Sequence, residues 1–244
     1  MSDDVPDKCR NCDADISLGQ VHCGNCGQKY ATERLTLHEI GHDLLHALMH
    51  VDRSALSLVR MLLVRPGTVA LDYVQGKRKR YFGPFSFLVV VVAAASAVIA
   101  LTGFRAVTSD SPNVVADFLQ SHINLLIFAE VPLLAVFSRL LDVRGRFNLA
   151  EHLVLAAYTS SMRVLFATLI VIPFWYVFRP SNPTAAALAS LAIWALYYGF
   201  AASQFFPGRG ALSWCRGFLT AVFSFASMQG LITLVASLSL RPEA

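Results

Sequence analysis

The sequence carries little charge for its length. Asp, Glu, Lys and Arg make up 15% of the 244 residues, whereas hydrophobic residues make up 55%. A soluble domain has roughly 25% charged residues, so this balance excludes an ordinary soluble domain. The first residues, MSDDVPDKCRNC, contain no apolar core. We therefore expect no cleavable signal peptide, since the first span of a multi-pass protein can direct insertion.

Cysteine is scarce outside the N-terminal region, and no internal repeat or low-complexity tail is visible. Four of the five cysteines lie within residues 9–26, and only Cys215 lies beyond them. A lone cysteine near an apolar segment is most often a small buried hydrophobe, which is our expectation for Cys215. Composition divides the chain into a polar segment with the cysteines (1–33), an amphipathic basic segment (34–80) and an apolar segment (81–244).

Long apolar runs fill the last of these segments. We predict five membrane spans, near residues 84–104, 122–141, 152–177, 184–206 and 215–239. Each has about 20 residues or more, enough to cross a hydrocarbon core of about 30 Å at about 1.5 Å per residue. Membrane helices tolerate interior prolines such as Pro132 and Pro173. The predicted fold class is an all-α polytopic membrane protein with amphipathic interfacial helices and a small N-terminal zinc ribbon before the spans.

Basic residues are distributed unequally between the two sides of the predicted bundle. One side carries Lys77, Arg78, Lys79, Arg80, Arg139, Arg144, Arg146, Arg209 and Arg216. The other side carries only Arg105, Arg179 and Arg241. Basic residues accumulate on the cytoplasmic side, so we expect the N-terminus in the cytoplasm, the C-terminus outside, and an inner-membrane location.

The four N-terminal cysteines form two C-x-x-C knuckles, CRNC and CGNC, ten residues apart. The expected cytoplasmic location is reducing, which favours metal binding over disulfides. Two such knuckles can supply four thiolates in the tetrahedral arrangement of a closed structural zinc site. The ligands would be Cys9, Cys12, Cys23 and Cys26. A redox dithiol pair is the alternative, but a redox C-x-x-C normally opens a helix in a βαβ unit, and this segment is too short for one.

The stretch HEIGHDLLHALMH has a histidine at every fourth position: His38, His42, His46 and His50. It also contains H-E-x-x-H, in which His38 and His42 would bind zinc and Glu39 would act as the base of a metalloprotease. A third ligand and an enclosing domain are missing from the short region before the first span. The apolar residues fall opposite the histidines, so we favour an interfacial amphipathic helix. Weak metal binding or a pH response of the histidines stays open.

A polybasic collar, Lys77–Arg78–Lys79–Arg80, lies between aromatic residues just before the first span. Each basic residue near an anionic leaflet contributes about 1 kcal/mol to membrane attraction. The simpler interpretation is that the collar only sets the topology. The functional alternative is specific contact of its four side chains with anionic lipid headgroups. We expect no nucleic-acid partner.

These motifs together resemble a family of uncharacterised bacterial multi-pass membrane proteins. The family pattern combines an N-terminal ribbon ending in C-G-Q, an R-P-G turn and G-K-R-x-x-Y before the first span. The corresponding residues here are Cys23, Cys26, Gly27 and Gln28, then Arg65, Pro66 and Gly67, then Gly76, Lys77, Arg78 and Tyr81. Glu151–His152 is also similar to the family pattern. The resemblance implies an architecture and not an activity, because the family has no known function.

Two opposite charges fall in the middle of predicted spans, Glu130 in the second and Arg163 in the third. A charge at the centre of a membrane helix costs about 2.5–3.5 kcal/mol on insertion scales, so such residues usually face the bundle interior and pair. The two spans are joined by a short loop and should be antiparallel neighbours. We therefore predict a Glu130–Arg163 ion pair.

The sequence favours a non-enzymatic role, that of a membrane-anchored adaptor whose zinc ribbon binds a cytoplasmic protein. The alternative is a small transporter or lipid-handling protein with a site inside the bundle, and a metalloprotease using HEIGH comes third. A polar cavity between the spans would favour transport, whereas a solid bundle would favour the adaptor. Self-association of the chain remains open.

Overall fold

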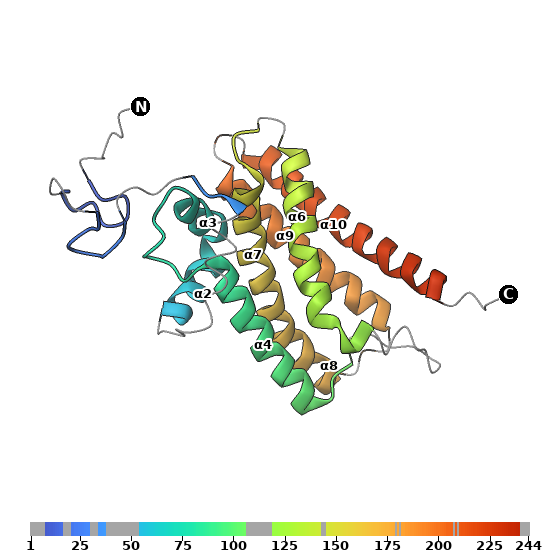
Figure 1. Cartoon of the computed structure of the whole chain (residues 1–244). Helices are drawn as coiled ribbons and strands as arrows, with labels where there is room; N and C mark the ends of the chain where they lie inside the picture. The colour runs from blue at the N-terminus through green and yellow to red at the C-terminus, as the bar shows by residue number, and fades with distance from the viewer. Residues whose placement is uncertain are drawn as a thin grey trace.

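The computed structural model describes residues 8–16, 21–29, 34–37, 54–105, 119–142, 145–178, 180, 182–206, 208 and 210–239. Across them the chain is helical, with two short helices followed by a bundle of long ones, and the cysteine segment lies beside one end of the bundle (Figure 1). The described residues contain no strand, only the isolated antiparallel bridges Lys8–Asp15 and His22–Lys29. The all-α prediction is confirmed.

Among the described residues, five helices are long and apolar enough to cross a membrane. They are α4 (Pro84–Thr102), α6 (Ile123–Leu141), the run Leu149–Phe178, α9 (Pro183–Phe205) and α10 (Gly210–Ser239). The run Leu149–Phe178 comprises α7 (Leu149–Phe166), a π turn (Ala167–Val171) and α8 (Ile172–Phe178). The predicted multi-pass architecture is confirmed.

Two span boundaries differ from the prediction for identifiable reasons. The third span begins at Leu149 because Asn148 caps it: the Asn148 side chain accepts from the Glu151 amide, and Glu151 accepts from the Asn148 amide. This reciprocal box satisfies two of the free amides at a helix start. The fifth begins at Gly210, so Arg216 lies in a helix and not in the loop. The expectation for Cys215 was wrong, because it is exposed on α10.

Helix α7 is the centre of the bundle and packs against α4, α6 and α9 (Figure 1). Six of its thirteen buried residues are small, including Ala156, Ala157 and Ser161, and small residues let neighbouring backbones approach closely in a membrane. The π turn precedes Pro173, whose ring crowds the carbonyl four residues earlier and which has no amide to donate. A π turn is a recognised way to accommodate such a site within a helix.

Two of the described helices lie between the cysteine segment and the spans. Helix α2 (Ser54–Val64) buries Leu58 and Leu62 and exposes Leu56, Leu63 and Val64, as an interfacial helix would. Helix α3 (Pro66–Val74) begins at the proline of the R-P-G turn and packs against α7 and α9. The Gln204 side chain on α9 accepts from the Gly67 amide and donates to the Val64 carbonyl, so it bridges the end of α2 and the start of α3.

Candidate metal centre and its docking site

The four N-terminal cysteines converge on one point. We call the described residues 8–16 and 21–29 the cysteine module. The ligand atoms of Cys9, Cys12, Cys23 and Cys26 all lie within 4.8 Å of one another. The Sγ atoms of Cys9 and Cys26 are 3.6 Å apart, as are those of Cys12 and Cys23. Thiolates around a tetrahedral ion with metal–sulfur bonds of about 2.3 Å would be about 3.8 Å apart, so the spacing suits such an ion.

The two knuckles share one backbone design. In the first, the Cys9 amide donates to the Ala14 carbonyl and the Asp13 amide donates to the Cys9 carbonyl. In the second, Cys23, Gln28 and Gly27 make the same two bonds. Asp13 and Gly27 each follow the second cysteine of a knuckle, and both have positive φ, 58° and 70°. Glycine adopts this region freely and aspartate tolerates it, which explains both residue types.

The environment of the thiols differs within the cluster. Hydrogen bonding from the Cys26 backbone amide lowers the pKa of Cys23 to about 6, although burial opposes it. Burial raises the pKa of Cys9 to about 11. Bound metal requires all four in the thiolate form, so binding would release protons. Four thiolates would complete the shell of a tetrahedral ion, as in closed structural sites.

Gln28 fixes the module to the membrane bundle. Its side chain is buried, and its Nε2 donates to the Gly76 carbonyl at 2.6 Å. Its Oε1 accepts from the Lys79 amide at 3.2 Å. Gly76 itself has φ 103°, a conformation that favours glycine. The glutamine of the C-G-Q motif therefore forms hydrogen bonds with the backbone of the G-K-R-x-x-Y motif.

Asp72 organises the same loop from the other side. Its carboxylate accepts from Lys77 Nζ and from the Tyr81 hydroxyl, both at 2.7 Å. Burial alone would raise the pKa of Asp72, but these bonds hold it below its ordinary value of 3.8. Burial and the bond to Asp72 raise the pKa of Tyr81 to about 12. Lys77 thus has a protein partner, Arg78 is half-buried, and Lys79 and Arg80 are exposed.

A second clamp joins the chain after the module to the start of α7. Arg34 donates from Nε and Nη2 to the two carboxylate oxygens of Glu151, both at 2.8 Å, and from Nη2 to the Arg146 carbonyl at 3.0 Å. Asn148 Nδ2 donates to the Leu35 carbonyl at 2.9 Å. Glu151 therefore serves both the helix cap and the docking of the N-terminal segment.

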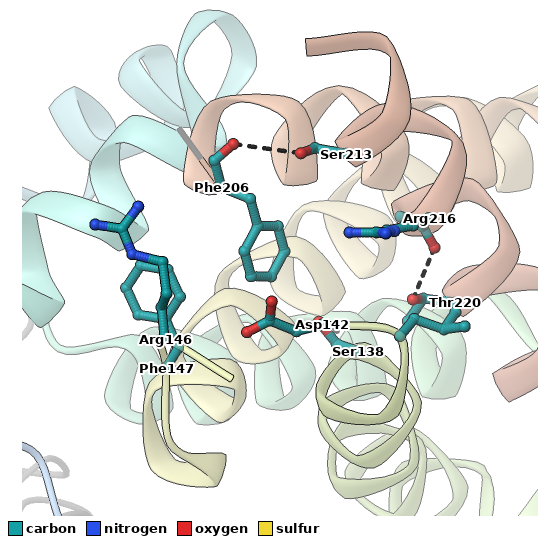
Figure 2. Close-up of a pocket in the computed structure, with 10 residues that line it drawn as sticks. Ser138, Asp142, Arg146, Phe147, Phe206, Ser213, Arg216 and Thr220 are labelled. Atoms are coloured by element: carbon teal, nitrogen blue, oxygen red, sulfur yellow. Dashed lines mark hydrogen bonds between the residues drawn. The ribbon is translucent and has the colours of Figure 1, made fainter. Parts of the chain in front are cut away.

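A small cavity of about 30 Å³ lies where the α6–α7 turn meets the start of α10 (Figure 2). The side chains of Asp142, Phe206 and Arg216 point into it, and Ser138 lines it. Behind Ser138, buried His152 contacts the Ser138 hydroxyl through Nδ1 at 2.8 Å, and its Nε2 lies 3.7 Å from Asp142. The space suffices for about one or two waters and not for a solute.

The structure brings together Glu130 and Arg163, whose side chains meet between α6 and α7. The histidines at 38, 42, 46 and 50 and Glu39 lie outside the described residues. Sequence reasoning missed the roles of Gln28, Asp72 and Arg34. Local signals existed only for the capping box N-x-x-E at 148–151 and for Asp72, whose partners Lys77 and Tyr81 are near in the chain. The partners of Gln28 and Arg34 are 48 and 117 residues away.

Comparison with known proteins gives one match. A family model described as a protein of unknown function (DUF3667) matches residues 58–95, from within α2 to within α4. The stretch contains the R-P-G turn and the G-K-R-x-x-Y motif. No curated protein and no solved structure matches the chain. The chain is thus similar over this stretch to a family without a known activity, and the comparison favours no particular reaction.

Proposed function

We propose that this protein is a non-enzymatic membrane adaptor whose cysteine module holds one structural zinc ion and presents a surface to a protein partner. The observation that carries the proposal is the docking of the module. A closed four-thiolate site is fastened to the bundle by Gln28 and, beyond the module, by Arg34. A rigidly held module suits a recognition surface, because less conformational freedom is lost on binding.

The geometry at the α6–α7 turn supports the adaptor over a transporter. The cavity of about 30 Å³ is too small for a solute. Glu130 and Arg163 satisfy each other, and Arg163 also lies over the Trp194 ring, which supports a packing role for these charges.

The proposed orientation rests on the basic residues: the collar, Arg139, Arg146 and Arg216 lie near span ends on one side of the bundle. We propose that this end and the module face the cytoplasm of a cell with an inner membrane.

The first test concerns zinc. Elemental analysis of the purified full chain should give one zinc per protein, and Cys23→Ser should lose it. Cys215→Ser is the matched control and should retain it, because Cys215 lies on α10, away from the cluster. Full zinc in the Cys23→Ser protein would contradict a four-cysteine site.

The second test concerns the partner. Val21 is 60% exposed on the module, so a photo-crosslinking residue placed there would sample the proposed surface without disturbing the core. In native membranes we expect one adduct of defined mass that disappears when Cys23→Ser is added. Leu101, 88% exposed on α4, is the control position and should give lipid adducts. Adducts only with lipid at Val21 would contradict the adaptor.

A further inference from the structure

A groove of about 300 Å³ separates the cysteine module from the bundle. Three arginines from three parts of the chain line it: Arg10 from the first knuckle, Arg34 from the connecting segment and Arg146 from the turn before α7. The rest of its wall is formed by Val74, Gln75, Gly76, Phe147 and Glu151. We call this the arginine groove. Its size lies at the lower end of the range typical of ligand sites, about 300–1,000 Å³.

The single acidic residue of the lining is already neutralised. Each carboxylate oxygen of Glu151 accepts a hydrogen bond from Arg34, and Oε2 also accepts one from the Asn148 amide. This pairing raises the pKa of Arg34, so the guanidinium stays charged. Arg34 uses Nε and Nη2 in its hydrogen bonds to Glu151 and to the Arg146 carbonyl. The lining of the groove contains three guanidinium groups and one carboxylate.

The groove lies near the ends of several candidate membrane spans. Its residues adjoin the start of α4, the α6–α7 turn and the start of α7, which are all span ends on one side of the bundle. The collar residues Lys79 and Arg80 are exposed at the same end. An anionic group diffusing in this leaflet would therefore meet positive charge first at the collar and then in the groove.

We propose that the arginine groove is a binding site for a phosphoryl group, as carried by a phosphomonoester lipid headgroup. Guanidinium groups present paired N–H donors that match phosphate oxygens, and they do so better than lysine ammonium groups. Gly76 and Glu151 in its wall are held by hydrogen bonds from Gln28 and Arg34. A small soluble phosphate ester has the same chemistry, and the experiment below separates the two sources.

The test uses the full chain in phosphatidylcholine nanodiscs that contain spin-labelled phosphatidic acid. Electron spin resonance gives the association constant of phosphatidic acid relative to phosphatidylcholine. Arg146→Gln and Arg10→Gln should each lower this constant about fivefold, as expected for loss of one cation near a headgroup. Arg146 is suited to this change because Arg34 binds its carbonyl, which the substitution leaves in place. Arg80→Gln removes the same charge from the same end but outside the groove, and it should lower the constant less than Arg146→Gln does.

The alternatives have distinct outcomes. An equal loss in Arg80→Gln and Arg146→Gln would overturn the site, because general surface charge would then explain the binding. Equal retention of phosphatidic acid and phosphatidylcholine by the unmodified protein would also overturn it. Glycerol 3-phosphate, added as a competitor, should not displace the lipid if the bilayer is the source. Displacement that Arg146→Gln weakens would support the phosphoryl site and assign a soluble ligand to it.

Discussion

Arg163 donates a hydrogen bond from Nη1 to Glu130 Oε1, joining α7 to α6 within the bundle. The guanidinium carbon of Arg163 lies 4.4 Å from the centre of the Trp194 ring on α9. One arginine thus links three helices through an ion pair and a cation–π contact. Both interactions strengthen where water is excluded, which suits a position within membrane spans.

Removing either charge should destabilise the bundle. Glu130→Ala or Arg163→Ala leaves an uncompensated buried charge, which costs about 3 kcal/mol or more. The double change Glu130→Arg with Arg163→Glu should recover part of that loss, although it forfeits the contact with Trp194. Thermal unfolding in detergent measures the effect. A double variant no more stable than the worse single variant would argue against direct pairing.

Gln28→Ala should release the module without emptying the metal site. The change removes the bonds to the Gly76 carbonyl and the Lys79 amide but leaves the four cysteines in place. Losing a buried hydrogen-bond pair costs about 1–3 kcal/mol, so the Lys79 amide should exchange hydrogen about tenfold faster or more. Hydrogen–deuterium exchange of the 76–81 peptide checks this, with exposed Lys29→Ala as the control. Unchanged exchange with unchanged zinc content would show that Gln28 does not hold the module.

Gly217 and Gly230 lie in the same helix and should respond oppositely to a methyl group. A Cβ at Gly217 would lie 2.4 Å from Ala202 Cβ, whereas at Gly230 it would meet nothing within 4 Å. Gly217→Ala should therefore separate α9 from α10 and cost about 1–3 kcal/mol. Gly230→Ala should be neutral or stabilising by up to about 1 kcal/mol, since alanine favours helices. Equal melting temperatures for the two variants would contradict the close crossing.

The Asp72 cluster should respond to acid within a defined window. The pKa of Asp72 in the folded protein is lower than its ordinary value of 3.8, so its contribution to stability is complete above pH of about 4. That contribution is lost as pH falls from about 4 through the lower folded value. Thermal unfolding measured between pH 7 and pH 3 should show this loss of stability. The Asp72→Asn variant should be less stable than the unmodified protein at pH 7, and its stability should fall less in acid. If Asp72→Asn lost as much stability in acid as the unmodified protein, the loss would come from other groups.

The local chemistry of the chain determined the spans and the cysteine cluster. In lipid, the backbone of a run of about 20 apolar residues can satisfy its hydrogen bonds by forming a helix. Five such runs therefore predict five spans. C-x-x-C spacing restricts each pair of thiols to a small region, so the ligand set is visible in the sequence. Charges in the middle of two adjacent spans, Glu130 and Arg163, predict their own pairing because isolation is costly.

The tertiary structure decided how these parts are joined. Gln28 and Gly76 are 48 residues apart, and Arg34 and Glu151 are 117 apart. No periodicity or local motif encodes such pairs, because each bond depends on where the intervening helices place the backbone. The same is true of the arginine groove, whose three arginines meet only after the module docks. Local sequence therefore specified the elements, and long-range packing specified the surface between the module and the bundle.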